Sequence, residues 1–201
     1  MKSLIAIAAI LFGFASMSNA QFKKGEVELS LSGSLGSMTN KYTTTSTGGK
    51  WSNSESNNYL FVSVMPGYYL VDGLSVEPEI GFLAVQHSEP AEYFLFNLSY
   101  TYLIPDTREA LYARAGYGIA NSVEMPYFSG AIGKFSDKLN VGVINLGAGV
   151  KFLLTNSVAL RTELNYRTHT WSNSVDYGYG SYSSDQTMSN FGLLIGFSIL
   201  L

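Results

Sequence analysis

The sequence contains no cysteine. This absence excludes a disulfide-stapled scaffold, a thiolate metal site, a cysteine nucleophile and a lipidated N-terminal cysteine. Charged residues are also scarce, because they make up 13% of the chain against about 25% in soluble globular domains. So few charges cannot cover the surface of an ordinary soluble protein. The formal net charge of −3 leaves no basic footprint, so no nucleic-acid partner is expected.

The sequence also lacks any apolar run of the roughly 18 or more residues that a spanning helix requires. Its longest apolar run, Leu4–Phe14, is shorter, follows the positive Lys2 and precedes the small-residue site Ser18-Asn19-Ala20. This order is typical of a secretory signal peptide. We therefore expect residues 1–20 to be a cleaved signal peptide and residues 21–201 to be the mature domain. An uncleaved anchor is the alternative.

What the chain has instead is alternation of apolar and polar residues. With 46% hydrophobic residues it would collapse rather than remain disordered, and the spacing of these residues favours strands over helices. Three tight turn motifs, at 71–73, 105–107 and 155–157, alternate with longer polar connections at 37–58, 85–92, 121–139 and 169–186. The expected strands cover residues 27–35, 60–70, 74–84, 94–102, 111–119, 144–152, 158–168 and 191–201.

The charges within these segments decide which face points outward. No charged residue lies in the apolar parity, and all of them lie in the opposite one. A soluble barrel would place charges outside, whereas a small barrel in a membrane can hold them inside as ion pairs. We therefore predict an all-β fold, an eight-stranded antiparallel up-and-down transmembrane β-barrel, with an internal network of structural charges. These residues are Glu26, Glu28, Glu77, Glu79, Arg114, Lys151, Arg161, Glu163 and Arg167.

Aromatic residues form two groups at the depths where lipid headgroups would lie, which is typical of membrane interfaces. Both groups are expected to face outward. The group near the tight turns is Tyr68, Tyr100, Tyr102 and Phe152, and the group toward the long connections is Tyr59, Phe82, Phe94, Tyr117, Tyr166 and Phe191.

Two local motifs extend this pattern. The segment from Pro66 to Leu74 is a strand, turn and strand, and Asn190-x-Gly192-x-x-Ile195-x-Phe197 lies near the chain end. With the signal peptide and the eight strands, they make residues 21–201 similar to the small eight-stranded outer-membrane barrels of the OmpX/OmpA type, in the outer membrane protein β-barrel domain or porin-like family.

The resemblance implies an integral, multi-pass protein of the Gram-negative outer membrane, monomeric and surrounded by lipid. It implies that the barrel assembly machinery and periplasmic chaperones are partners during biogenesis, with the motif around Asn190, Gly192, Ile195 and Phe197 as the assembly signal. The chain departs from that signal by running four residues further and ending in Leu201. The expected role is structural or in surface recognition, without enzymatic activity.

Chemistry-bearing residues are few, and no catalytic site, metal site or cofactor is predicted. The segment His87-Ser88-Glu89 superficially offers a base, a nucleophile and an acid. A lipid-modifying enzyme is therefore one alternative function, although neighbouring strand residues point to opposite faces and could meet only within a loop. His169 is expected in a loop. A small porin-like channel is the other alternative, disfavoured because side chains fill the interior of an eight-stranded barrel.

The long connections contain a repeated tetrapeptide that includes the only two tryptophans. Trp51-Ser52-Asn53-Ser54 lies in the first connection and Trp171-Ser172-Asn173-Ser174 in the fourth, near Tyr177 and Tyr179. Because barrel closure pairs the first strand with the last, these connections should lie side by side outside the cell. Tyr, Trp, Ser and Asn are frequent in recognition surfaces. The sequence therefore indicates a surface for an extracellular ligand. The alternative is a solvated covering in which the two tryptophans are anchors at the rim.

Overall fold

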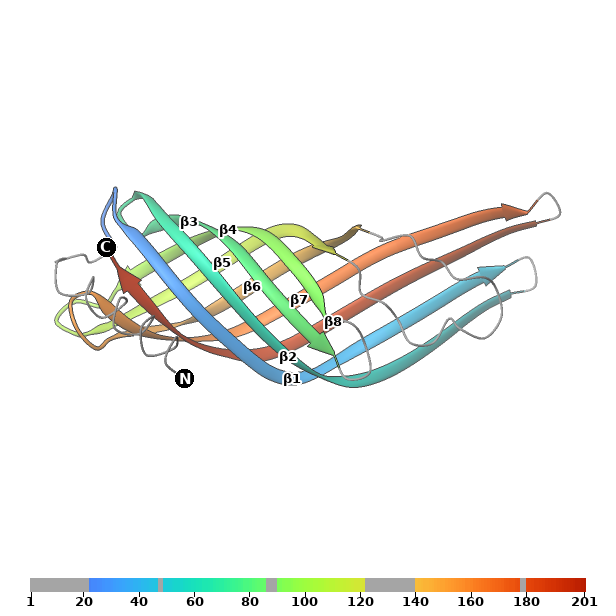
Figure 1. The fold of residues 1–201 in the computed structure, drawn as a ribbon, viewed down its shortest axis with the longest axis horizontal. Coiled ribbons are helices and arrows are strands. Elements are labelled where there is room, and N and C mark those ends of the chain that lie inside the picture. Colours follow the sequence, from blue (N-terminus) through green and yellow to red (C-terminus); the bar gives the residue numbers. More distant parts are fainter. Residues whose placement is uncertain (1–21, 47–48, 86–89, 122–139, 178–179) are drawn as a thin grey trace, which may run out of the picture.

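The computed structural model describes residues 22–46, 49–85, 90–121, 140–177 and 180–201. Within this part the chain forms a closed barrel in which each strand pairs antiparallel with its sequence neighbours and β1 pairs with β8 (Figure 1). None of the described residues forms a helix long and apolar enough to cross a membrane. The strands are β1 (Val27–Ser46), β2 (Gly49–Val71), β3 (Leu74–Val85), β4 (Ala91–Leu103), β5 (Glu109–Asn121), β6 (Asn140–Leu153), β7 (Val158–Tyr177) and β8 (Gly180–Leu200).

Apolar and polar side chains alternate along each strand, so that the barrel has an apolar outer face and a largely polar interior. In β4, Phe96 and Leu98 are about half exposed, at 56% and 52%, while the intervening Asn97 is 1% exposed. The same pattern holds around the barrel, where large apolar side chains point outward and most buried polar ones point inward. This arrangement confirms the predicted eight-stranded transmembrane barrel, because an exterior of this kind is stable against hydrocarbon rather than water.

The predicted aromatic groups face outward with one exception. Tyr100 near the turns and Phe82 toward the long connections are 55% and 53% exposed. Tyr59 was predicted among the outer group, and this prediction is wrong, because its side chain is 4% exposed and lies inside the barrel. The reason is the strand's alternation: Leu60 and Val62 occupy the outward positions of β2, so their neighbours Tyr59 and Phe61 point inward.

The hairpin that joins β2 to β3 depends on a glycine. Val71 pairs with Leu74, so only Asp72 and Gly73 form the turn. Gly73 has a φ of 77°, in the left-handed region that residues with a Cβ avoid. A Cβ at this position would also lie 2.5 Å from the Thr101 carbonyl oxygen. The turn therefore needs glycine both for its backbone conformation and for its close approach to β4.

We expect Gly73→Ala to lower the free energy of unfolding by about 1–3 kcal/mol, the range for a strained backbone conformation. Urea unfolding of the refolded protein in lipid vesicles measures this loss. Gly25→Ala is the matched control, because Gly25 has a φ of 89° and no atom within 4 Å of its Cβ position. Equal losses in the two variants would mean that the contact with Thr101 contributes nothing.

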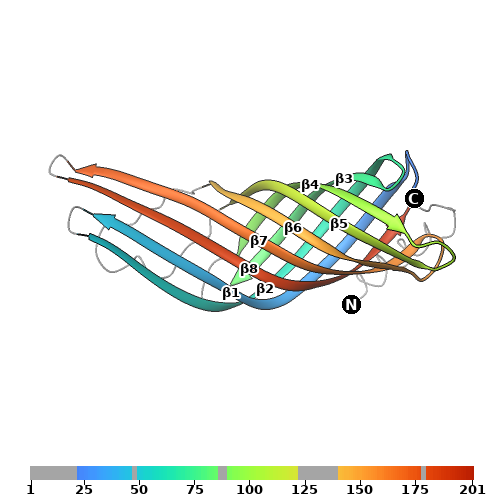
Figure 2. The same ribbon diagram turned by 180° about the vertical axis from the view of Figure 1, so that it is seen from behind.

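The predicted long connections 37–58 and 169–186 are not loops. β1 and β2 stay paired until Ser46 and Gly49, and β7 and β8 until Tyr177 and Gly180. β1 and β8 also pair with each other as far as Thr45 and Ser183. Figures 1 and 2 show these two hairpins extending well beyond the other strands. Ser and Asn are common in turns, but here their backbone groups are satisfied by a continuing ladder, and the threonines of β1 favour strand.

We define the outer extension as residues 40–46, 49–58, 171–177 and 180–187, the strand ends beyond the barrel rim. The rim is marked where β2 and β3 end their pairing at Tyr59 and Val85, and where β6 and β7 end theirs at Gly142 and Thr170. The outer extension is therefore a four-stranded antiparallel sheet in the order β2-β1-β8-β7. Among the described residues, nothing pairs with its two outermost strands on their outer sides.

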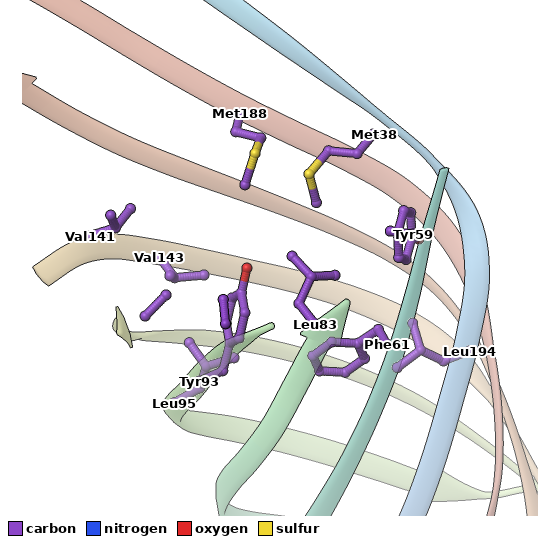
Figure 3. Close-up of a cluster of buried hydrophobic side chains, with 12 residues drawn as sticks. Met38, Tyr59, Phe61, Leu83, Tyr93, Leu95, Val141, Val143, Met188 and Leu194 are labelled. Atoms are coloured by element: carbon purple, nitrogen blue, oxygen red, sulfur yellow. The ribbon is translucent and has the colours of Figure 1, made fainter. Parts of the chain in front are cut away.

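The barrel interior has three layers. At the turn end, Phe22, Tyr69 and Leu200 belong to a small apolar cluster. Charged and amide side chains fill the middle. Toward the outer extension lies the outer apolar cluster (Figure 3), which consists of Met38, Tyr59, Phe61, Leu83, Ala91, Tyr93, Leu95, Ala120, Val141, Val143, Met188 and Leu194.

Candidate functional site

The middle layer of the interior contains eight of the nine charged residues singled out in the sequence. Each of the eight side chains is buried, with no residue more than 3% exposed. Four acids and four bases give this layer a formal charge of zero. The ninth residue, Glu26, precedes β1 at the turn end and accepts a hydrogen bond from the Lys23 backbone N–H at 2.7 Å. The eight are Glu28, Glu77, Glu79, Arg114, Lys151, Arg161, Glu163 and Arg167.

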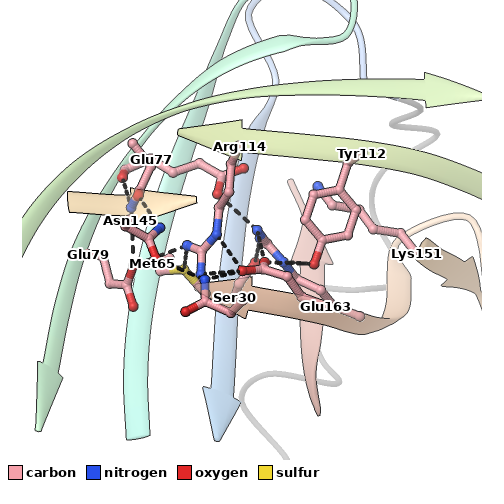
Figure 4. Close-up of polar contacts among 12 residues, drawn as sticks. Ser30, Met65, Glu77, Glu79, Tyr112, Arg114, Asn145, Lys151 and Glu163 are labelled. Carbon is pink, nitrogen blue, oxygen red and sulfur yellow. Dashed lines mark hydrogen bonds and ion pairs between the residues drawn. The ribbon is translucent and has the colours of Figure 1, made fainter. Parts of the chain in front are cut away.

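Six of these charges form one chain of alternating sign across the barrel. Figure 4 shows its members Glu79, Arg114 and Glu163. Arg114 bridges two acids on opposite sides, with N–O distances of 3.0 Å to Glu79 and 2.8 Å to Glu163. Glu163 also pairs with Arg161 at 3.2 Å. The chain ends are Arg167, 2.6 Å from Glu79, and Glu77, 3.2 Å from Arg161. Strands β3, β5 and β7 are thereby joined through the interior.

The remaining two charges form a separate pair near the turn end. Lys151 on β6 lies 2.6 Å from Glu28 on β1. The Tyr69 hydroxyl donates a second hydrogen bond to the same Glu28 oxygen, also at 2.6 Å. The Lys151 ammonium lies 5.1 Å from the centre of the Phe22 ring. This pair shares no ion-pair partner with the chain of six, although the Tyr112 ring lies near both, 5.2 Å from the Lys151 ammonium and 4.4 Å from the Arg161 guanidinium.

Neutral side chains satisfy much of the remaining hydrogen-bonding capacity. The Tyr112 hydroxyl donates to Glu163 at 2.8 Å and accepts from Arg161 Nε at 2.8 Å. Three asparagines continue this network, because Asn145 donates to Asn97 at 2.7 Å and Asn165 donates to Asn145 at 2.8 Å. These asparagines were not singled out from the sequence, although they share the strand parity of the charges and could have been found from it.

Aromatic rings pack against the charged groups and complete the filling of the interior. The Arg167 guanidinium lies 3.9 Å from the centre of the Phe61 ring, and that of Arg161 lies 4.4 Å from the Tyr112 ring. Arg161, Arg167, Tyr69 and Phe61 are the largest fully buried side chains of the described residues, and all point inward. Side chains thus occupy the space that water fills in wider barrels.

The residues predicted for surface recognition lie in the outer extension, at the end of the barrel away from the tight turns. Trp51 is 76% exposed on β2. Trp171 and Tyr177 lie on β7 at register positions opposite Gln186 and Gly180, and Tyr179 lies outside the described residues. Trp51 pairs with Thr44 on β1, which pairs with β8. The two tryptophan strands are therefore the outermost strands of one continuous sheet.

The residues of the predicted assembly signal lie along β8. Ile195 and Phe197 face outward, at 52% and 55% exposed, whereas Asn190 is 7% exposed and faces inward. The residues beyond the motif complete the barrel, because the Leu201 N–H donates to the Val27 carbonyl at 2.8 Å and the Leu201 carbonyl accepts from the Val27 N–H at 3.2 Å. Recognition of this segment by the assembly machinery stays a prediction.

The two histidines have different outcomes. His87 and Ser88, the basis of the lipid-modifying alternative, lie outside the described residues. His169 was predicted in a loop, and this is wrong: it lies within β7, 1% exposed, with Nδ1 3.1 Å from the Met188 carbonyl oxygen. The prediction failed because β7 continues past residue 168, which keeps His169 in the inward parity. No three His, Asp or Glu residues in the described ranges are grouped to hold a metal.

The closed eight-stranded barrel with its internal charges agrees with the family comparison. The sequence matches the family described as outer membrane protein beta-barrel domain over residues 5–198. The chain belongs to this family. As an outer membrane protein β-barrel it is an integral protein of the bacterial outer membrane. No curated protein matches the chain.

Several solved structures of outer-membrane barrels are similar to this chain. OprG from Pseudomonas aeruginosa has 12% sequence identity and a TM-score of 0.55, over 89% of this chain and 97% of that one. The N-terminal barrel domain of Pseudomonas aeruginosa OprF has 13% identity and a TM-score of 0.48, covering 89% and 98%. Neisserial surface protein A has 12% identity and a TM-score of 0.45, covering 88% and 99%. At these identities the likeness to OprG supports the fold alone.

Proposed function

We propose that this outer membrane β-barrel protein is a non-enzymatic surface protein that binds an extracellular partner through its outer extension. The single observation that carries the proposal is the continuation of four barrel strands, as one paired sheet, beyond the rim of the other four. A paired sheet holds its residues in fixed positions, which lowers the entropic cost of binding compared with loops. The predicted pair of recognition loops is thereby replaced by a single ordered surface.

The composition of the outer extension supports recognition. Trp51 leaves most of its large amphipathic side chain free, at 76% exposed, and such residues are frequent anchors of binding surfaces. The second tryptophan, Trp171, lies on the far edge of the same sheet. Around them the strands carry mainly Ser, Thr, Asn and Tyr, which supply adaptable hydrogen bonds. Two sheet edges without partners among the described residues offer further backbone donors and acceptors.

The alternative of a porin-like channel has less support. A solute would have to pass the chain of six charges and the outer apolar cluster, both of which are buried. Displacing one member would leave a buried charge without its partner, which is energetically costly. We therefore propose that the buried side chains stabilise the barrel and that the outer extension binds the partner.

Replacing both tryptophans, as Trp51→Ala with Trp171→Ala, is expected to abolish binding at the cell surface without changing folding. The reason is that both residues lie on strand segments beyond the barrel rim, outside the paired wall of the barrel. Cells that display the protein on their surface are applied to a glycan array and to immobilised matrix proteins, and the bound cells are counted. Folding is measured by heat-modifiable migration in detergent gels.

The matched control is Tyr68→Ala with Tyr100→Ala, which removes two exposed aromatic residues from the turn end of the barrel. These residues face the opposite side of the membrane from the outer extension, so this variant should bind as the wild type does. Equal binding by the tryptophan variant and the wild type, on every surface to which the wild type binds, would refute the proposal.

A further inference from the structure

The wall of the barrel is interrupted at the seam between β1 and β8. Their ladder runs from Glu28 and Leu200 to Gly33 and Ile195, and resumes at Met38 and Asn190. Residues 34–37 and 191–194, all of which the structure describes, form no ladder pairs in between. The register is the same on both sides, because four residues lie between the paired positions on each strand. The ladder therefore stops and resumes without a bulge.

A second interruption, between β2 and β3, shows why the first is unusual. There, residues 65–67 and 77–79 form no ladder pairs. Pro66 and Pro78 lie within these segments, and proline has no N–H to donate to a ladder. None of the eight residues at the β1–β8 interruption is a proline. The interruption between β1 and β8 is therefore not a consequence of missing backbone donors.

Two glycines and one tyrosine occupy the β1–β8 interruption. Continuing the register places Gly36 opposite Gly192, so neither strand has a side chain to cover this point. The Tyr59 side chain of β2 covers it from the interior. A Cβ at Gly36 would lie 3.0 Å from the Tyr59 hydroxyl, and one at Gly192 would overlap that hydroxyl. The Tyr59 and Ser34 hydroxyls are 3.3 Å apart, which holds the ring in place.

Apolar side chains lie on both sides of this point. On the outer face of the wall, Leu35, Phe191 and Leu193 are 76%, 64% and 50% exposed, in the outward parity that faces lipid. On the inner face, Tyr59 belongs to the outer apolar cluster together with Met38 (Figure 3). The route from the bilayer to this cluster thus crosses no charged side chain, and the Tyr59 ring lies across its inner side.

We propose that the β1–β8 interruption is a lateral portal through which an acyl chain of a surrounding membrane lipid reaches the outer apolar cluster. An acyl chain fits the site because it is slender, apolar and makes no hydrogen bonds, and because the portal opens toward the bilayer. Its position near the outer extension assigns it to lipids of the outer leaflet. Rotation of the Tyr59 ring away from Gly36 and Gly192 opens the portal. The portal is independent of any partner of the outer extension.

Contact between lipid and interior can be measured directly by nuclear Overhauser effects, which detect only close approach of protons. The deuterated protein, with protonated Met and Leu methyl groups, is placed in nanodiscs of protonated dimyristoylphosphatidylcholine. The Met38 methyl reports the outer apolar cluster. The Met65 methyl is the internal control, because Met65 is also buried but its sulfur accepts a hydrogen bond from Arg114 in the charged layer. Methyl groups of outward-facing Leu193 report ordinary lipid contact.

The portal predicts an acyl-chain Overhauser effect at Met38 and none at Met65. Tyr59→Ala, which removes the ring, should strengthen the effect at Met38. The wild-type chain has no cysteine, so a disulfide between Leu35→Cys and Leu193→Cys can lock the portal selectively. Oxidation of this pair should remove the effect, and reduction should restore it. Leu31→Cys with Phe197→Cys, at an intact ladder pair of the same seam, is the matched control that should change nothing.

Absence of the effect at Met38 in both the wild type and Tyr59→Ala, while Leu193 shows lipid contact, would overturn the proposal. An effect that persists unchanged in the oxidised Leu35→Cys/Leu193→Cys pair would also overturn it, because lipid would then enter elsewhere. Heat-modifiable migration verifies that each variant is folded. If the cysteine pair does not fold, the comparison of the wild type with Tyr59→Ala decides the question alone.

Discussion

Replacing Arg161 with methionine is expected to lower the free energy of unfolding by about 3–5 kcal/mol, the range for removing one partner from a buried ion pair. Arg161 donates to two acids, with N–O distances of 3.2 Å to both Glu77 and Glu163. Its Nε also donates to the Tyr112 hydroxyl. The variant leaves two carboxylates short of a partner in a layer that is otherwise neutral. Methionine keeps much of the side-chain volume, so the loss reports charge rather than packing.

Urea unfolding in lipid vesicles, with migration on gels as the second probe, measures this loss. Arg108→Met is the matched control, because Arg108 is exposed at the turn end and its nearest acceptor, the Leu154 carbonyl, is 3.5 Å away. Its removal should change stability by less than about 1 kcal/mol, as for other surface charges. An unchanged unfolding midpoint for Arg161→Met would show that water, and not Arg161, satisfies the two acids.

Lys151→Met is expected to have a comparable effect that a second substitution can reverse. Lys151 and Glu28 form a pair outside the chain of six, 2.6 Å apart. The single variant leaves Glu28 with the Tyr69 and Ser30 hydroxyls as neutral donors, and we expect a loss of about 3–5 kcal/mol. In the double variant Lys151→Met with Glu28→Gln, no charge remains without a partner. Its stability should return to near the wild-type value, because replacing a whole buried pair is often neutral.

A double-mutant cycle compares the two sites. For Lys151 and Glu28, the interaction energy should account for most of the single-variant loss. For Arg161, adding Glu163→Gln should recover only part of the loss, because Glu77 still lacks its partner and Arg114 loses one of its two acids. Equal recovery at both sites would contradict the division of the interior into a separate pair and a chain of six.

Strand alternation was sufficient to predict which residues lie inside the barrel. The parity of Leu111 and Ala113 places Arg114 inward without any knowledge of its partners. Which acid meets which base could not be predicted, because the pairs connect residues far apart in the sequence, such as Glu28 and Lys151, separated by 123 positions. Which side chains meet inside the barrel depends on the tilt and stagger of the strands, and the pattern of a single strand does not contain this information.

Two errors have one physical origin. Tyr59 and His169 were both assigned from their position near polar segments rather than from their parity. The polar segments were themselves misjudged, because Ser, Asn and Gly are common in turns but are also compatible with strands that are paired on at least one side. Nothing in β1 alone reveals that β8 continues beside it as far as Ser183. A propensity scale describes one segment at a time, whereas the outer extension forms only because four strand segments pair with one another.

The bond between Leu201 and Val27 has a consequence for how the barrel enters the membrane. Leu201, directly after β8, hydrogen-bonds with the first residue of β1, so closure requires both β1 and β8 to be in place. The interior imposes the same requirement, because Glu28 on β1 finds its base on β6. A partly assembled sheet would expose open backbone edges and single charges to hydrocarbon, each costing several kcal/mol. Insertion should therefore be an all-or-none kinetic event in which half-formed barrels do not accumulate.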